Sequence, residues 1–161
     1  MGMQICRVLI LNARLKGKKN DILFIKILKV MVKNKFVSDY QINASKKIIF
    51  PYLSTASGLG EWFADNVTID HNKTFHIDYD GTDHYARIVS IRTNHLVKFE
   101  FFDPEIENED DNSYVEFKLE ENELTQTIFL KIIDYSDGYE EDELEKIWEG
   151  LIANLKEIIG G

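Results

Sequence analysis

The sequence predicts an α+β fold in which an antiparallel sheet packs against a long C-terminal helix. Two observations lead to this prediction. Six runs between residues 66 and 135 alternate apolar and polar side chains, as half-buried strands do, and short turn sequences connect most of them. Residues 140–159 instead repeat apolar side chains every three or four positions, as an amphipathic helix does. A chain of 161 residues that is 44% hydrophobic can form the core of one such domain.

The first part of the domain should contain one strand and two short helices. Alternation predicts the strand from Phe36 to Ile42. The next apolar residues follow helical spacing, but Pro51 lies too deep to be a first-turn proline, so this helix should be short or kinked. Gly58 and Gly60 interrupt the segment after it. We therefore expect two short helices rather than one long helix.

Six further strands should follow in series and make a seven-stranded antiparallel sheet with the first. Asp80-Gly81 between two alternating runs is a strong hairpin signal. The longest break, PEIENEDDN, is predicted to be an acidic loop. The six runs are NVTID (66–70), TFHIDY (74–79), YARIVSIR (85–92), LVKFEFF (96–102), YVEFKLE (114–120) and LTQTIFLKIIDY (124–135).

The last segment predicts a helix from about Glu140 to Ile159. Four acidic residues at its start suit the positive end of a helix dipole, and Gly160 suits a left-handed cap at its end. Its apolar stripe must be buried, and the sheet is the only partner large enough. The stripe consists of Leu144, Ile147, Trp148, Leu151, Ile152, Leu155, Ile158 and Ile159.

Charge is divided unevenly along the chain. Residues 1–35 carry nine Lys or Arg residues and one acid, whereas residues 36–161 carry ten basic and 27 acidic residues. Such an acidic body repels phosphate, so we expect no nucleic-acid partner. The single cysteine, Cys6, excludes an internal disulfide, and no Cys/His spacing matches a zinc site. The simplest interpretation is a cytoplasmic, monomeric protein.

The basic N-terminal segment, residues 1–30, differs from the rest of the chain. Its apolar run at 22–32 contains Lys26 and Lys29, is too short for a membrane span, and is followed by no small-residue cleavage site. We hypothesise that Met31 is the initiator and that residues 31–161 form a single domain. A membrane-surface helix and an extra strand or helix are the alternatives. The intact mass of the native protein distinguishes them, because a mass that includes Met1 or Gly2 contradicts the hypothesis.

The stretch ASKKIIFPYLSTASGLGEWFAD resembles the segment that joins the first two strands in START-like proteins of the helix-grip fold. More narrowly, it resembles bacterial homologues of the activators of the heat-shock-chaperone ATPase. In that group the short helices end in a Gly-Leu-x-x-Trp-Phe element, represented here by Gly58, Leu59, Trp62 and Phe63. The resemblance covers about residues 36–159. One departure is DNVTIDHNKTFHIDYDG, which stands where many homologues have a glycine-rich strand pair.

This resemblance implies a curved sheet wrapped around the C-terminal helix, with a pocket for a small apolar ligand between them. The alternative implied role is a protein-interaction module that binds a chaperone ATPase. A cyclase- or hydrolase-type enzyme is a further alternative, although no catalytic residue is predicted. The opposing possibility is that the aromatic side chains close-pack and leave no room for a ligand. The expected pocket walls are Trp62, Phe63, Phe75, Ile77, Phe99, Phe101, Val115, Phe117 and Trp148.

Other polar features predict no cofactor, no metal site and no nucleophile. The sequence contains no Gly-x-Ser-x-Gly elbow, and Cys6 lies outside the domain. Arg87 and Glu100, charged residues in apolar strands, are expected on a solvated face or in a cross-strand ion pair. The densest polar cluster lacks the spacing of a calcium loop. Alternation predicts that His76 and Asp78 point to solvent from their strand, and the other members lie in or beside turns. The members are Asp70, His71, His76, Asp78, Asp80, Asp83 and His84.

Overall fold

A computed structural model describes residues 33–105 and 112–160, so the N-terminal segment 1–30 and most of the acidic loop lie outside the described residues. The described chain forms seven strands and three helices. In chain order they are β1 (Asn34–Ile42), α3 (Lys46–Ser54), α4 (Ala56–Trp62), β2 (Asn66–Ile69), β3 (Phe75–Tyr79), β4 (Thr82–Arg92), β5 (Leu96–Phe102), β6 (Tyr114–Asn122), β7 (Thr127–Ser136) and α5 (Glu141–Ile159).

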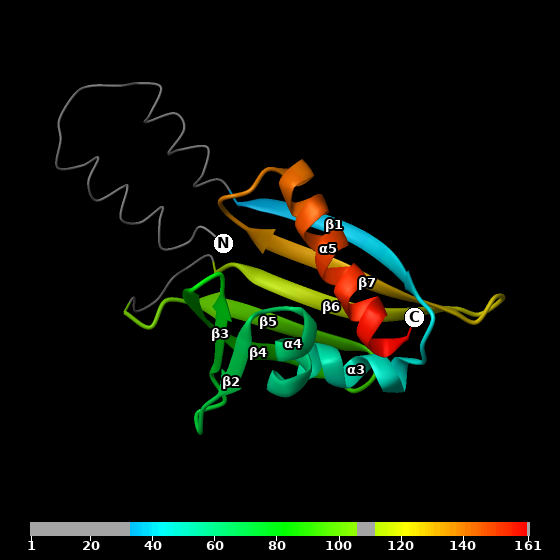
Figure 1. The fold of residues 1–161 in the computed structure, drawn as a ribbon, viewed down its shortest axis with the longest axis horizontal. Coiled ribbons are helices and arrows are strands. Elements are labelled where there is room, and N and C mark those ends of the chain that lie inside the picture. The colour runs from blue at the N-terminus through cyan, green and yellow to red at the C-terminus, as the bar shows by residue number, and fades with distance from the viewer. Residues whose placement is uncertain (1–32, 106–111, 161) are drawn as a thin grey trace.

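The seven strands form one antiparallel sheet in the order β1-β7-β6-β5-β4-β3-β2. Figure 1 shows a curved sheet with α5 lying across one face, while α3 and α4 lie on the same side of the sheet. The predicted α+β helix-grip architecture is therefore confirmed. The predicted Asp80-Gly81 hairpin is also present, because both residues have positive φ and connect β3 directly to β4.

Two strand boundaries differ from the prediction. β4 begins at Thr82 instead of residue 85, because the two-residue turn lets pairing start at once with Tyr79. β7 begins at Thr127 instead of residue 124. The preceding residues form a turn in which Asn122 Oδ1 accepts a hydrogen bond from the Leu124 amide, and Gln126 has φ of 55°.

The junction of the two short helices explains why glycine occupies position 58. Thr55 caps both helices: its hydroxyl donates to Pro51 O at 2.7 Å and accepts from the Gly58 amide at 3.0 Å. This geometry brings the helices so close together that a Cβ at position 58 would lie 2.3 Å from Pro51 O and 2.6 Å from Tyr52 Cα. Only glycine fits this contact.

Helix α5 begins and ends at the signals that the sequence contains. Glu140 and Glu143 form a reciprocal capping box, and Gly160 closes the helix in the left-handed conformation with φ of 73°. The predicted apolar stripe is largely buried, except for Ile158, which is exposed. Its buried members are Leu144, Trp148, Leu151, Ile152 and Leu155.

An aromatic cluster fills the centre of the space between the sheet and the helices. Phe117 of β6 lies at its middle, with its ring centroid 5.8 Å from Trp62 and 5.9 Å from Trp148. Phe63 stacks on Trp148 at 5.9 Å, and Phe99 packs edge-on against Phe117 at 6.3 Å. Such edge-to-face and stacked pairs stabilise the fold beyond the burial of their area.

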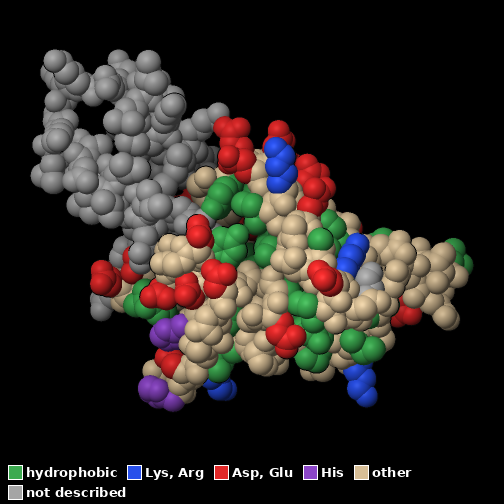
Figure 2. All heavy atoms as spheres, in the orientation of Figure 1, with side chains coloured by type: hydrophobic (Ala, Val, Ile, Leu, Met, Phe, Trp, Pro, Cys, Tyr) green, Lys and Arg blue, Asp and Glu red, His purple; other side chains and the backbone are tan. Residues whose placement is uncertain are grey.

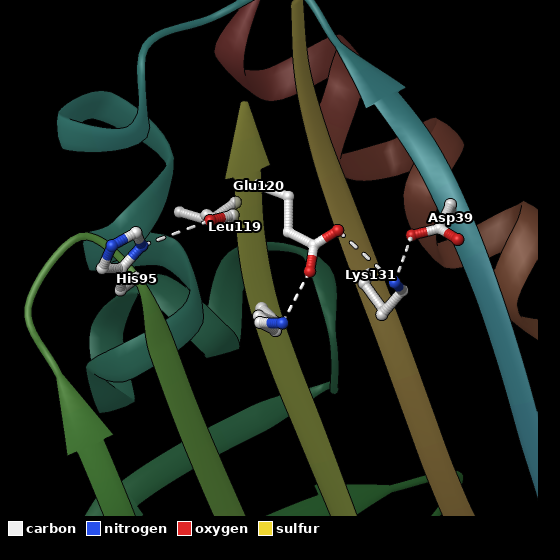
Figure 3. Close-up of polar contacts among 6 residues, drawn as sticks. Asp39, His95, Leu119, Glu120 and Lys131 are labelled. Atoms are coloured by element: carbon white, nitrogen blue, oxygen red, sulfur yellow. Dashed lines mark hydrogen bonds and ion pairs between the residues drawn. The ribbon is translucent and has the colours of Figure 1, made fainter. Parts of the chain in front are cut away.

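The opposite face of the sheet carries charged side chains that pair across strands. Arg87 Nη2 lies 2.7 Å from Glu100 Oε1, which confirms the predicted cross-strand ion pair. Figure 3 shows a second group on this face, in which Lys131 Nζ lies 3.4 Å from Glu120 Oε2 and 3.6 Å from Asp39 Oδ1. This face of the sheet therefore carries paired charges, whereas the opposite face packs against the helices.

Candidate functional site: a cavity under the first half of α5

A cavity of about 70 Å³ lies between the sheet and the first half of α5. The sheet contributes the ends of β3 to β7, and the residues between β7 and α5 close one side. Figure 2 shows apolar side chains at the surface beside the N-terminal half of α5, with acidic side chains at their border. Apolar walls include Phe63, Phe101, Val115, Leu144, Ile147, Trp148 and Leu151, and polar or aromatic-polar walls include Tyr79, His84, Ser113, Asp134, Ser136 and Tyr139.

Three polar side chains in the cavity wall are more than nine-tenths buried. His84 is 7% exposed, Ser113 3% and Asp134 7%. His84 Nε2, Ser113 Oγ and Asp134 Oδ1 are inaccessible to solvent and have no hydrogen-bond partner among the described residues. Buried polar atoms are nearly always satisfied, because leaving one unpaired costs about 1–3 kcal/mol. In this cavity a ligand group or an ordered water can form hydrogen bonds with these three atoms.

The strand alternation explains how these side chains come to point inward. Asp134 follows Ile128, Leu130 and Ile132 in the inward phase of β7 and lies opposite Val115 of β6. Ser113 precedes Val115 in the inward phase of β6, and its carbonyl accepts from the Phe101 amide at 2.8 Å. The local sequence thus places polar side chains where the apolar rows end.

Burial shifts the proton affinity of the two ionisable groups in opposite directions. Burial raises the pKa of Asp134 above its ordinary value, although the nearby Ser136 hydroxyl and Trp148 indole partly offset this. Trp148 Nε1 donates a hydrogen bond of 2.9 Å to Asp134 Oδ2. Burial also lowers the pKa of His84, which keeps this imidazole neutral at physiological pH. Burial thus acts against the charged form of each side chain, whereas at Asp134 the two hydrogen-bond donors act in favour of the carboxylate.

The nine residues that the sequence analysis proposed as pocket walls fall into two groups. Phe63, Phe101, Val115 and Trp148 line the cavity. The other five are buried in the core outside it, where aromatic contacts join most of them; they are Trp62, Phe75, Ile77, Phe99 and Phe117. Trp62 does not line the cavity, and its indole donates to Tyr52 O at 2.9 Å.

Sequence reasoning missed His84, Ser113 and Asp134 as wall residues. It grouped His84 with polar residues in or beside turns, whereas the structure places it on the inner face of β4, two residues before the buried Ala86. A signal was present in each case, since a polar residue continued an inward apolar row. A polar residue in an inward-facing apolar row is therefore a candidate for a pocket wall at the edge of the core.

The polar cluster at residues 70–84 does not assemble a metal site. Within residues 33–105 and 112–160, no three His, Cys, Asp or Glu side chains converge as metal ligands do. Asp70 instead holds its turn, because its Oδ1 accepts from the amides of Asn72 at 2.8 Å and Thr74 at 2.9 Å. These backbone hydrogen bonds lower the pKa of Asp70. Asp70 thus stabilises the turn between β2 and β3.

A family model for the START-like superfamily domain matches residues 30–161. The chain belongs to the START-like superfamily. The match covers every strand and helix of this START-like domain, including the cavity walls. Among curated proteins, no sequence matches the chain. Among the described residues of the domain, no helix is both long enough and apolar enough to cross a membrane.

Solved structures support the same fold for the START-like domain. The solution structure of the Aha1 dimer from Colwellia psychrerythraea matches with a TM-score of 0.62 at 17% identity, covering 78% of this chain and 96% of that one. A solution structure from Bacteroides fragilis matches with a TM-score of 0.52 at 37% identity, covering 80% and 92% of the two chains. A crystal structure from Mesorhizobium loti matches with a TM-score of 0.56 at 17% identity, covering 79% and 97%.

Proposed function

We propose that this START-like domain binds a small, mainly apolar molecule in the cavity under the first half of α5, as a carrier or a sensor. The observation that carries the proposal is the set of three buried polar atoms on His84, Ser113 and Asp134 that lack partners in an otherwise apolar cavity. Ligand sites typically combine apolar walls with a few polar groups that fix orientation. A close-packed core would contain neither the space nor the unpaired atoms.

The size of the cavity limits the ligand. Sites for drug-sized ligands span about 300–1,000 Å³, whereas this cavity has a volume of about 70 Å³. The ligand is therefore either small, or it enters as the first half of α5 moves outward. The half-buried Ile147 and Tyr139 lie at the wall beside this half of the helix and could yield to a larger ligand.

Native mass spectrometry of the purified protein, followed by solvent extraction, tests the proposal. A co-purifying molecule should be present in the wild-type protein and lost in Val115→Phe, which fills the cavity with a larger side chain. Val89→Phe is the matched control, because Val89 lies on a neighbouring part of the sheet but is 45% exposed. Absence of any co-purifying molecule, together with failure of apolar dyes to bind, would contradict ligand binding.

A protein-interaction role is the second candidate, and the outer face of the sheet favours it. Tyr114 and Tyr135 lie side by side there with ring centroids 5.3 Å apart, and Lys98 Nζ lies 3.7 Å from the Tyr114 centroid. Val37 of β1 is 50% exposed on the same side of the sheet. Half-exposed aromatic residues are enriched in protein interfaces. The fold shared with an Aha1 structure makes a heat-shock ATPase the first partner to test.

A pull-down from the native cytosol with the full chain tests this second candidate. We expect the ATPase to be recovered by the wild-type protein, to be lost with Tyr114→Ala, and to dissociate with increasing salt if the acidic loop contributes. The cavity variant Val115→Phe is the control, because it changes the opposite face of the sheet. Recovery that is unaffected by Tyr114→Ala would rule out this surface.

A further inference from the structure

The charges around the cavity restrict the chemical class of its ligand. No Lys or Arg belongs to the described cavity wall, whereas Asp134 and Asp137 do. The first turn of α5 adds three further acids, Glu141, Asp142 and Glu143. Figure 2 shows acidic side chains bordering the apolar surface on this side. A ligand carboxylate or phosphate would therefore be buried beside the Asp134 carboxyl group, with no Lys or Arg among the described wall residues to pair with it.

The hydrogen-bonding atoms of the cavity also favour a ligand that carries no negative charge. Trp148 already donates to Asp134 Oδ2 at 2.9 Å, so the indole is not free to donate to a ligand. Asp134 Oδ1 has no partner at hydrogen-bond distance among the described residues, although the Ser136 hydroxyl lies near the carboxyl group, and an ionised carboxylate can only accept. Ser113 Oγ and His84 Nε2 are the other two buried atoms, and both can complement a group that donates and accepts.

Building on the proposed ligand binding, we propose that Asp134 determines the specificity of the cavity. It selects a small, mainly apolar molecule whose polar end donates a hydrogen bond and carries no negative charge, such as an alcohol, an amide or an amine. It excludes carboxylates of the same size, such as short fatty acids. The physical reason is that burying an unpaired negative charge beside another carboxyl group costs more than the apolar chain can contribute.

The two tryptophans provide an internal readout for this proposal. The indole N–H of Trp148 contacts Asp134 at the cavity, whereas that of Trp62 donates to Tyr52 O in the core outside it. A ligand in the cavity should move the Trp148 indole signal in a ¹⁵N–¹H NMR spectrum and leave the Trp62 signal in place. A probe that disturbs the whole fold would move both signals.

The experiment titrates the full-length, ¹⁵N-labelled protein, after solvent extraction and refolding, with hexan-1-ol, hexylamine and hexanoate at pH 7. We expect hexan-1-ol or hexylamine to shift the Trp148 signal at a concentration at least tenfold below that needed for hexanoate. Asp134→Asn should reduce this discrimination several-fold, because the amide is neutral and also donates. Asp39→Asn is the matched control, since it makes the same chemical change on the opposite face of the sheet, beside Lys131.

The outcomes separate this inference from the proposed function. If hexanoate binds as tightly as hexan-1-ol, or if Asp134→Asn preserves the discrimination, the role of Asp134 is overturned and ligand binding stands. If none of the three probes shifts the Trp148 signal and no molecule co-purifies, both proposals are overturned. The wild-type comparison decides the question of charge even if Asp134→Asn does not fold, and the spectral dispersion of each variant shows whether it is folded.

Discussion

The indole of Trp148 and the carboxyl group of Asp134 form a buried hydrogen bond of 2.9 Å between the middle of α5 and strand β7. Trp148 is 2% exposed and Asp134 7%, so both partners are shielded from bulk water. The bond also lies in the cavity wall, where both side chains take part. It therefore links the stability of the helix–sheet contact to the chemistry of the cavity.

Trp148→Phe should lower the free energy of unfolding by about 1–3 kcal/mol beyond the loss of its packing, because Asp134 Oδ2 loses the indole donor in a buried site. Urea denaturation of Trp148→Phe, Asp134→Ala and the double variant measures the coupling between the two side chains. We expect the double variant to be more stable than the sum of the single changes predicts, by about 0.5–3 kcal/mol. Strict additivity would show that the hydrogen bond contributes nothing to stability.

Asp134→Asn should stabilise the protein at neutral pH. Burial raises the pKa of Asp134 in the folded state, so the ionised carboxylate destabilises the fold at pH values above that raised pKa. As the pH falls through the raised pKa towards the unfolded value of about 3.9, the proton neutralises the group and this penalty disappears. The stability difference between Asp134→Asn and wild type should thus shrink on acidification. Denaturation at pH 7, 6, 5 and 4 checks this, and a difference that grows on acidification would contradict it.

His84→Gln should make the protein less sensitive to mild acid. Burial lowers the pKa of His84, so the unfolded chain takes up a proton near its ordinary pKa of about 6.5 while the folded protein does not. Wild type should therefore lose stability as the pH falls through 6.5, and the variant should lose less. Melting temperatures between pH 8 and 5 measure the effect. His71→Gln is the control, because His71 is exposed.

Gly58→Ala should strongly destabilise the protein, although alanine is the better helix former. The added Cβ would lie 2.3 Å from Pro51 O, a backbone atom that cannot move aside without separating α3 from α4. Gly150→Ala is the matched control, since a Cβ at this exposed position of α5 meets nothing within 4 Å. It should raise the free energy of unfolding by about 0.5–1 kcal/mol. Urea denaturation measures the free energy of unfolding of both variants. If the two variants are equally stable, α3 and α4 do not make the close contact described at Gly58.

Leu155→Ala should lower the free energy of unfolding by about 2–5 kcal/mol, because Leu155 is fully buried on the sheet-facing side of α5. Ile158→Ala removes a similar volume from a position that is 38% exposed. Its effect should be much smaller, although both residues belong to the stripe that the sequence suggested. If the two variants unfold at the same denaturant concentration, α5 packs in a different rotational orientation.

The fold could be predicted from the sequence because each element has a local signature. Alternation predicts the strands, and the Asp80-Gly81 turn and the Gly160 cap mark element ends that the structure confirms. The site was harder to predict, because alternation tells which face a side chain points to and not where along that face the space is filled. Phe117 and Phe101 share the inner face, yet Phe117 closes the core and Phe101 borders the cavity. That difference depends on how far the rings of Trp62 and Trp148 reach, which is a property of the packed structure.

The inner face of the sheet is thus divided into a filled region around Phe117 and a hollow end around Asp134. Substitutions at Ser113 or Val115 change the size and polarity of the hollow end without removing a side chain from the aromatic cluster. Such a layout lets relatives of this domain diverge in what they accept while they keep the same architecture. Variation among homologues should accordingly concentrate at the cavity end of β4, β6 and β7, and a reprogrammed binder could be selected from a library restricted to these positions.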